Sequence, residues 1–215
     1  MTANPLRPMR RRSLCLAVVL ALTLGVGTVE ARPTTGGRDI QDFAQSSFQT
    51  RLSGAFECLY VDMTVRYFAG DNLQDPIGSG KPGSWSDAPV SVGVFDSCDD
   101  DTEVLHLEGL GFPDDGPDFD RLERAALDVS LMTLSDGLST FVDAEIHLVW
   151  VGNDDTTVRI GHDLETGSFR QERSESATVT GTVTFDASPV WGDLVFTGDD
   201  AHDTSIGTAN EITLP

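Results

Sequence analysis

The sequence predicts an all-β domain, an antiparallel β-sandwich of about nine strands, with a β-barrel as the alternative. Several short segments alternate apolar and polar residues, which places the apolar side chains on one face of a strand. Glycine, proline, asparagine and aspartate separate these segments at short intervals, as turns do. No segment sustains the 3.6-residue period of an amphipathic helix. Short strands joined by turns are typical of sandwiches and barrels.

The clearest alternation lies in residues 139–162, which predict a central β-hairpin. Its apolar positions recur at every second residue and are Val142, Ala144, Ile146, Leu148, Trp150, Val158 and Ile160. A turn at Asn153-Asp154-Asp155 would place Trp150 opposite Val158, so both strands would be apolar on the same side. A slip of one residue would turn one apolar row outward, so the pattern also predicts the register.

Further strands follow from the same alternation. We expect them at 56–68, 90–94, 104–110, 124–134, 177–185, 191–197 and 204–214, with exposed connections at 69–87, 111–120 and 163–176. Residues 120–123 (D-R-L-E) resemble a helix-capping box, but the alternation from Ala125 to Thr133 favours a strand there. Residues 32–54 lack sustained periodicity. We therefore expect a loosely ordered lead-in, with a short helix around 40–48 as the alternative.

Residues 1–31 have the three regions of a signal peptide. Four arginines precede an apolar core at 14–26, and residues 29–31 (V-E-A) offer the small residues that signal peptidase recognises. The apolar core is shorter than the roughly 20 residues that a membrane-spanning helix needs. Cleavage after Ala31 would leave the lead-in at 32–54 and a single β domain at 55–215. We expect this mature form to be secreted or periplasmic, with no membrane anchor.

The composition is strongly acidic. Cleavage would lower the acids from 35 to 34 and the bases from 14 to 10, so the formal charge would change from −21 to −24. Nucleic acids and anionic membrane surfaces are therefore disfavoured partners, because their phosphates would be repelled. The charge is compatible with cations, basic proteins or a salty medium, and equally with a solubilising surface.

Two cysteines, Cys58 and Cys98, would remain after cleavage. Exported proteins keep disulfides, so an even cysteine count predicts one bridge between them. Closing a loop of this size contributes about 4 kcal/mol in the chain-entropy account. Metal binding is the alternative, but no histidine is spaced near either cysteine as zinc ligands would be.

The loop at 111–120 concentrates carboxylates, with Asp114, Asp118 and Asp120 at its centre. Calcium binds six to eight oxygen atoms, and such a loop could supply several of them. Gly116, Pro117 and the missing distal glutamate depart from the EF-hand pattern. The alternative is a solvated acidic loop.

Signatures of catalysis are absent from the sequence. It contains no G-x-S-x-G elbow and no H-E-x-x-H, and no G-x-G-x-x-G or P-loop follows a predicted strand. The predicted hairpin places His147 on its polar face and His162 on its apolar face, so they would not share a metal. Trp85, within the loop G-S-W-S-D, is the candidate contact residue for a partner. The alternative for its indole is to cap the edge of the core.

Two segments carry a resemblance to known proteins. V-D-A-E-I-H-L-V-W-V-G at 142–152 and S-A-T-V-T-G-T-V-T-F at 176–185 resemble strands shared by a loose group of uncharacterised bacterial secreted β proteins. The likeness covers roughly the C-terminal half of the chain. Members of this group carry signal peptides and have no assigned activity. The resemblance therefore implies export and β structure, and it transfers no functional residue.

These observations lead to an expected function without a named ligand. We expect an exported, non-enzymatic β-domain protein with an extracellular interaction or structural role. One alternative is a carboxylate-dependent extracellular glycoside hydrolase, because two carboxyl groups at catalytic separation leave no sequence signature. A second alternative is a calcium-dependent binding module that uses the loop at 111–120.

The disulfide gives the first testable prediction. The exported protein unfolded without reductant is expected to show no free thiol, because Cys58 and Cys98 are joined. Titration with a thiol reagent before and after reduction measures this, and two thiols should appear only after reduction. Two free thiols before reduction would contradict the pairing.

Overall fold

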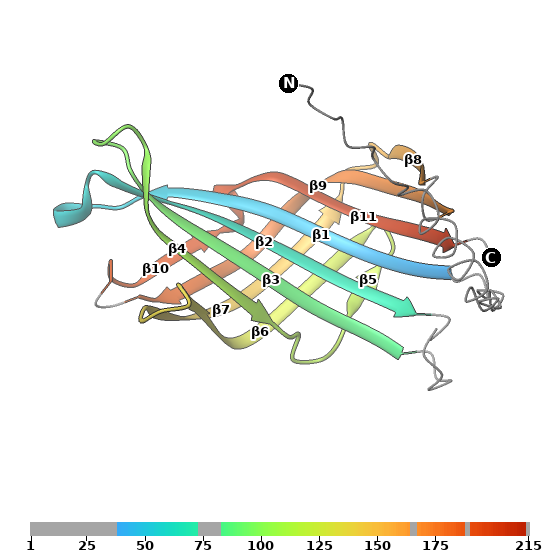
Figure 1. Cartoon of the computed structure of the whole chain (residues 1–215), viewed down its shortest axis with the longest axis horizontal. Coiled ribbons are helices and arrows are strands. Elements are labelled where there is room, and N and C mark those ends of the chain that lie inside the picture. The colour runs from blue at the N-terminus through green and yellow to red at the C-terminus, as the bar shows by residue number, and fades with distance from the viewer. Residues whose placement is uncertain (1–37, 73–82, 164–166, 188–189, 214–215) are drawn as a thin grey trace, which may run out of the picture. The chain divides into compact units, whose positions relative to one another are not determined.

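The chain is almost entirely strand in the computed structural model, which describes residues 38–72, 83–163, 167–187 and 190–213 (Figure 1). Within these residues, eleven strands belong to one antiparallel sheet, which confirms the predicted all-β class. No helix among the described residues is long and apolar enough to cross a membrane. The predicted signal peptide at 1–31 lies outside this part of the chain.

The strands are β1 (Arg38–Arg51), β2 (Leu59–Asn72), β3 (Gly83–Asp96), β4 (Thr102–Gly111), β5 (Asp118–Asp120), β6 (Arg124–Ser135), β7 (Phe141–Gly152), β8 (Thr157–Asp163), β9 (Ser168–Asp186), β10 (Leu194–Thr197) and β11 (Ala201–Thr213). Two short 3-10 turns, η1 (Gly54–Phe56) and η2 (Gly198–Asp200), connect them.

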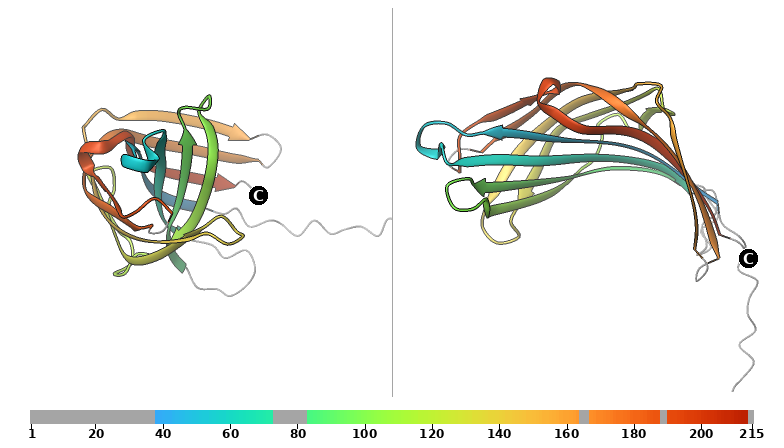
Figure 2. Two further views of the ribbon diagram at one scale, coloured as in Figure 1. Left: turned by 90° about the vertical axis from the view of Figure 1, so that its left-hand side faces the viewer. Right: turned by 90° about the horizontal axis from the view of Figure 1, so that it is seen from above.

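The sheet closes on itself. Strands pair in the order β1-β2-β3-β4-β6-β7-β9-β11, and β11 pairs again with β1, so the path forms a ring (Figure 2). The pairing thus follows the barrel alternative, since no second sheet packs against the first. The junction between β4 and β6 is the thinnest part of the ring, with a single paired position, Glu108 opposite Ser135.

Large apolar side chains fill the ring. The bulkiest of those with almost no exposed surface are Trp150, Tyr67, Phe48, Phe185 and Phe196. The rings of Tyr67 and Trp150 lie 6.4 Å apart, and those of Phe48 and Phe196 lie 5.9 Å apart. The predicted alternation of β7 is confirmed, because every second residue from Val142 to Trp150 is buried. The interior is therefore a packed core.

The hairpin predicted at 139–162 is wrong, although both of its strands exist. β7 is paired on both edges, with β6 and with β9, so no edge is free for β8. Gly152 pairs with Ala177 and Thr157 pairs with Ser174, so β7 and β8 follow one edge of β9 in succession. The four residues 153–156 oppose two residues of β9, 175 and 176, which makes this segment a bulge with two extra residues.

Because the bulge inserts an even number of residues, the apolar side chains of β7 and β8 stay on the same face of the sheet. Trp150 lies opposite Val179 and Val158 lies opposite Arg173, and both pairs point to the inner side of the sheet. The prediction that the two apolar rows share a face is therefore right, and the prediction that they face each other is wrong. Val158 and Ile160 are 51% and 66% exposed because nothing described here covers them.

The predicted lead-in is also wrong within the described residues. Residues 38–51 form β1, which pairs with β2 and β11, and no helix forms around 40–48. Its inner face carries Ala44, Ser46 and Phe48, all fully buried. Alanine and serine weaken the apolar pattern, so the strand could not be recognised from periodicity. The sheet therefore includes residues that lie before the predicted boundary at 55.

The connection predicted at 163–176 is likewise part of a strand. Residues 168–176 are the first half of β9 and pair with β8 and β11. They lie in a region that we call the overhang, which comprises 38–45, 66–72, 83–88, 157–163, 168–176 and 205–213. These residues extend the sheet past the ring as an open, curved surface (Figure 2). Open sheet is exposed to water, which explains the polar sequence.

Trp150 gives a prediction about stability. Its Nε1 donates to Ser46 Oγ at 3.1 Å and to Gln45 O at 3.2 Å. Trp150→Phe removes the donor and leaves buried oxygen atoms unpaired, so we expect unfolding to become easier by about 1–3 kcal/mol. Urea denaturation measures this. Trp85→Phe is the control and should cost less than about 0.5 kcal/mol, because that side chain is exposed. Equal losses would contradict this role for Trp150.

Candidate functional site

A hollow of about 820 Å³ lies where the overhang leaves the ring. It is formed by β1, the turn between β5 and β6, the end of β7, the bulge, β9 and β11. The residues that line it are Ile40, Asp42, Arg121, Leu122, Glu123, Val151, Gly152, Asp154, Arg173, Glu175 and Thr208. Large side chains fill the ring, and this open hollow is a place where a ligand could bind.

A buried carboxylate shapes one wall of the hollow. Glu175 is only 8% exposed, and it accepts hydrogen bonds from Asp154 N at 3.0 Å and from Thr156 Oγ1. Both donors belong to the bulge, so this side chain holds the bulge in shape. Gly152 is required beside it, because a Cβ there would lie 2.3 Å from the carbonyl oxygen of Leu122. Close packing therefore joins the bulge to the turn that carries Arg121.

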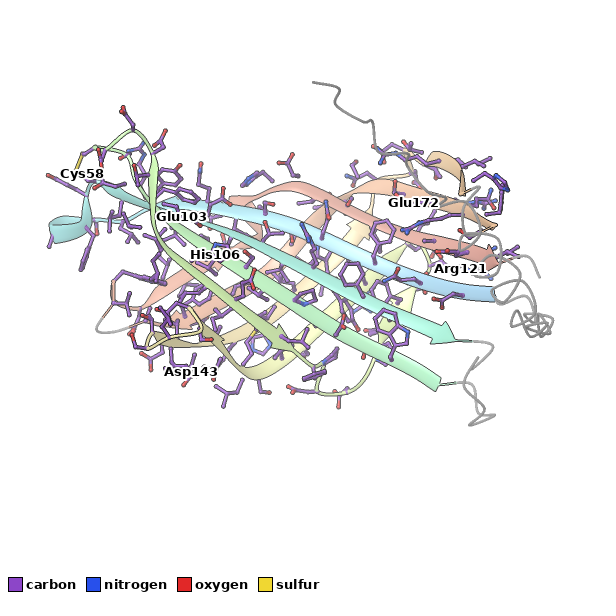
Figure 3. All side chains as sticks on the ribbon, viewed as in Figure 1. Cys58, Glu103, His106, Arg121, Asp143 and Glu172 are labelled. Atoms are coloured by element: carbon purple, nitrogen blue, oxygen red, sulfur yellow. A yellow bond between two sulfur atoms is a disulfide. The ribbon has the colours of Figure 1, made fainter. Side chains whose placement is uncertain are left out.

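Two arginines line the hollow without an acidic partner. Arg121 occupies the turn after β5 with a left-handed φ of 49°, and Arg173 lies on the inner face of β9. Among the described residues, neither has a carboxylate within 4.0 Å, whereas Arg124 and Arg170 are ion-paired. Figure 3 shows Arg121 at the end of the unit remote from Cys58. Unpaired guanidinium groups can bind a carboxylate with two parallel hydrogen bonds.

The rest of the lining is aliphatic or acidic. Ile40, Leu122 and Val151 supply aliphatic surface. The buried Glu175 carboxylate is occupied by the bulge, Asp42 is half-buried, and Glu123 and Asp154 are exposed to water. The hollow thus combines two arginines and four carboxylates with an apolar wall. The sequence analysis missed Arg121 and Arg173, and the only signal was the rarity of basic residues.

Two carboxylates of the acidic loop bond to β6. Asp114 Oδ2 accepts from Ser130 N at 2.9 Å, and Asp118 pairs with Arg124 at 2.8 Å. The two carboxylates therefore tie the loop to β6. Asp118–Asp120 also forms the short strand β5, inside a segment predicted to be loop. Within the described residues, Asp114, Asp118 and Asp120 do not form a group of metal-ligand atoms.

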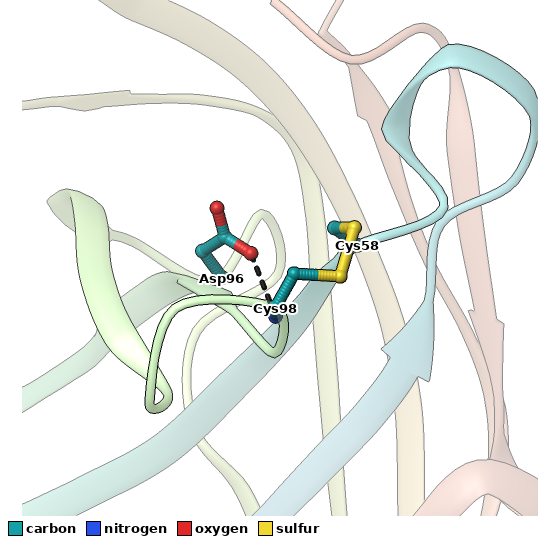
Figure 4. Close-up of side chains that lie close together, drawn as sticks. All are labelled: Cys58, Asp96 and Cys98. Carbon is teal, nitrogen blue, oxygen red and sulfur yellow. Dashed lines mark hydrogen bonds between the residues drawn. A yellow bond between two sulfur atoms is a disulfide. The ribbon is translucent and has the colours of Figure 1, made fainter.

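The predicted disulfide is present. Cys58 and Cys98 are bonded, with Cα atoms 5.4 Å apart, and Cys98 N donates to Asp96 Oδ1 at 2.8 Å (Figure 4). These three residues are the single cluster of metal-ligand types within the described residues. Both sulfur atoms are consumed by the bridge, so the cluster is structural. A disulfide is compatible with an extracellular location.

Trp85 lies outside the hollow. It sits on β3 opposite Gly70, and a Cβ on Gly70 would lie 2.8 Å from the indole. The ring therefore packs flat over a glycine on the outer face of the overhang, with 38% of its surface exposed. Of the two sequence interpretations, the packing role is the one this contact supports.

A second group of polar residues lies on the outer face of β3 and β4. Ser91 Oγ is 3.5 Å from His106 Nε2, and His106 Nδ1 is 2.8 Å from Glu103 Oε1 (Figure 3). This order resembles a catalytic triad, but Glu108 also lies 3.3 Å from Nε2. β3 is paired on both edges, so its backbone offers no donors for an oxyanion. The group is better described as a charge network across two strands.

The remaining histidines do not come together. His147 bonds to Asp128 on the outer face of β6 and β7, beside a cleft lined by Asp115 and Asp118. His162 lies on β8, exposed and paired with Phe169. The prediction that His147 and His162 do not share a ligand is therefore consistent with their positions, although the hairpin used to reach it is absent.

Comparison with protein-family models, curated proteins and solved structures finds no match for the chain. The resemblance to secreted bacterial β proteins therefore stays a prediction. Function has to be argued from the hollow and its chemistry.

The charge network gives a prediction about pH. Hydrogen bonds that the His106 ring donates to the Glu103 and Glu108 carboxylates raise the pKa of His106 above its ordinary value of 6.5. Protonated His106 therefore stabilises the fold below about pH 6.5, and this contribution is lost as the pH rises through the higher folded pKa. An NMR titration of the imidazole measures the shift.

A pair of acid substitutions tests its cause. Glu103→Gln combined with Glu108→Gln should return the pKa of His106 towards 6.5. Glu145→Gln, an equal loss of charge on β7, should leave it unchanged. An unshifted His106 in the unmodified protein would contradict the network.

Proposed function

We propose that the chain is an exported, non-catalytic binding protein whose ligand occupies the hollow between the overhang and the ring. The observation that carries this proposal is the pair of guanidinium groups, Arg121 and Arg173, beside aliphatic surface. A guanidinium group next to aliphatic surface favours an anion with an apolar body, although both arginines are exposed. The ligand class is therefore an amphipathic carboxylate.

The inner face of the overhang supports this class. Val158 and Ile160 lie on the same face as Arg173 and are largely exposed, so apolar surface continues outward from the hollow. A carboxylate held by the two arginines would lay its hydrocarbon chain along this surface. Burying it would contribute about 25 cal/mol for each Å² of apolar area.

Export is part of the same proposal. Its support is the signal-like order of residues 1–31 together with the disulfide. The glycoside hydrolase and calcium alternatives are supported by the sequence alone. Burial raises the pKa of two carboxyl groups, Asp62 and Asp87, as a general acid would require. Neither residue lines the hollow.

Calorimetric titration with dodecanoate, below its micelle concentration, tests the proposal. We expect saturable binding, and we expect Arg121→Gln or Arg173→Gln to weaken it about tenfold to hundredfold, because each removes a charge-assisted contact. Arg159→Gln is the matched control and should bind normally, since Arg159 points to the opposite face of β8. Circular dichroism checks that each variant is folded.

Three results would contradict the proposal. One is the absence of heat with dodecanoate. Another is equal binding of dodecyltrimethylammonium, which has the same chain and the opposite charge. The third is an Arg159→Gln variant that loses as much affinity as the two hollow variants.

A further inference from the structure

We propose that β8 is a self-association edge, through which two copies of this chain pair their β8 strands antiparallel and join their sheets. β8 pairs with β9 on one side, and its other side has no strand partner among the described residues. An unpaired edge presents a row of backbone N–H and C=O groups that another strand satisfies. The chemistry of the edge therefore specifies an extended chain as the partner.

The composition of β8 suits strand pairing. Its seven residues, Thr157 to Asp163, contain no proline, and Thr157, Val158 and Ile160 are β-branched. β5 and β10 have three and four residues, which are short for a strand interface. Val158 and Ile160 are 51% and 66% exposed, so a neighbouring strand would cover apolar surface that is now in water.

The local charge around β8 favours a second copy of the chain as the partner. The chain as a whole carries a formal charge of −21, so most of its faces repel their equivalents. Around β8 the balance differs, because Arg159, Arg170 and Arg173 outnumber Glu172 and Asp163. β4 also has a largely unpaired edge, but Asp99, Asp100, Asp101 and Glu103 lie at its start. Two such acidic edges would repel each other, whereas two β8 edges would not.

Two features determine the register of the pairing between the two copies: the overlap of their β8 strands and the position of Arg159. A twofold axis at Ile160 aligns all seven residues of both strands, because this residue is the centre of the strand. Ile160 then faces Ile160 of the second copy, and Arg159 faces Gly161. An axis one residue earlier would place Arg159 against its own copy, and like charges directly opposite each other destabilise a sheet. The axis at Ile160 is therefore the favoured one.

Sedimentation equilibrium on the exported chain tests this pairing. We expect a concentration-dependent dimer, and we expect Ile160→Lys and Ile160→Glu each to weaken dimerisation about tenfold or more. Mixing these two variants should restore a dimer, because lysine then faces glutamate across the axis. Ile160→Thr is the control and should still dimerise, since threonine favours strands and is uncharged.

Each alternative outcome is decisive. A chain that stays monomeric at about millimolar concentration would overturn the proposal, and so would a dimer that Ile160→Lys leaves intact. Failure of the mixed variants to pair would overturn the register. Circular dichroism and thermal unfolding confirm that the variants fold, which an exposed position favours. The dimer does not require a ligand in the hollow, so its test is independent of dodecanoate binding.

Discussion

The pairing of β9 on both edges is the constraint on which the rest of this structure depends. One edge is shared by β7 and β8, and the other by β10 and β11. On the first edge, the four residues between Gly152 and Thr157 oppose two on β9. On the second, the seven residues between Thr197 and Ser205 oppose five. Each edge therefore carries two extra residues, opposite adjoining parts of β9, and the even number keeps apolar side chains facing inward.

These matched bulges separate the molecule into a closed and an open part. Below them, β7 and β9 complete a ring filled by Trp150 and its neighbours. Above them, the same strands continue as the overhang, where Val158 and Ile160 on the inner face are exposed while Ala44 and Tyr67 remain buried. Glu175 fixes one bulge by accepting hydrogen bonds from its backbone and from Thr156. The hollow is thus a product of the transition between the two parts.

The distribution of charge determines how the hollow and β8 could bind a ligand or a partner. Acidic side chains cover most of the surface and are individually solvated, so they direct little recognition. Arginines are scarce, and several of them gather near the hollow and β8. A small number of cations in an acidic chain therefore has more influence on binding and association than the net charge suggests. The disulfide lies at the opposite end of the unit, where it joins the start of β2 to the turn after β3.

The sequence by itself determined the fold class, the disulfide and the inner face of β7, because residue alternation and cysteine count are local or compositional properties. The turn after β6 is also local, because the Asp136 carboxylate accepts from Leu138 N and Ser139 N. Only the tertiary structure decided that 153–156 is a bulge, because a reversing turn and a bulge use the same residues. Likewise, β1 and the first half of β9 became recognisable only through their partners. Arg121 and Arg173 are 52 residues apart, and only closure of the sheet around β9 brings them to one hollow.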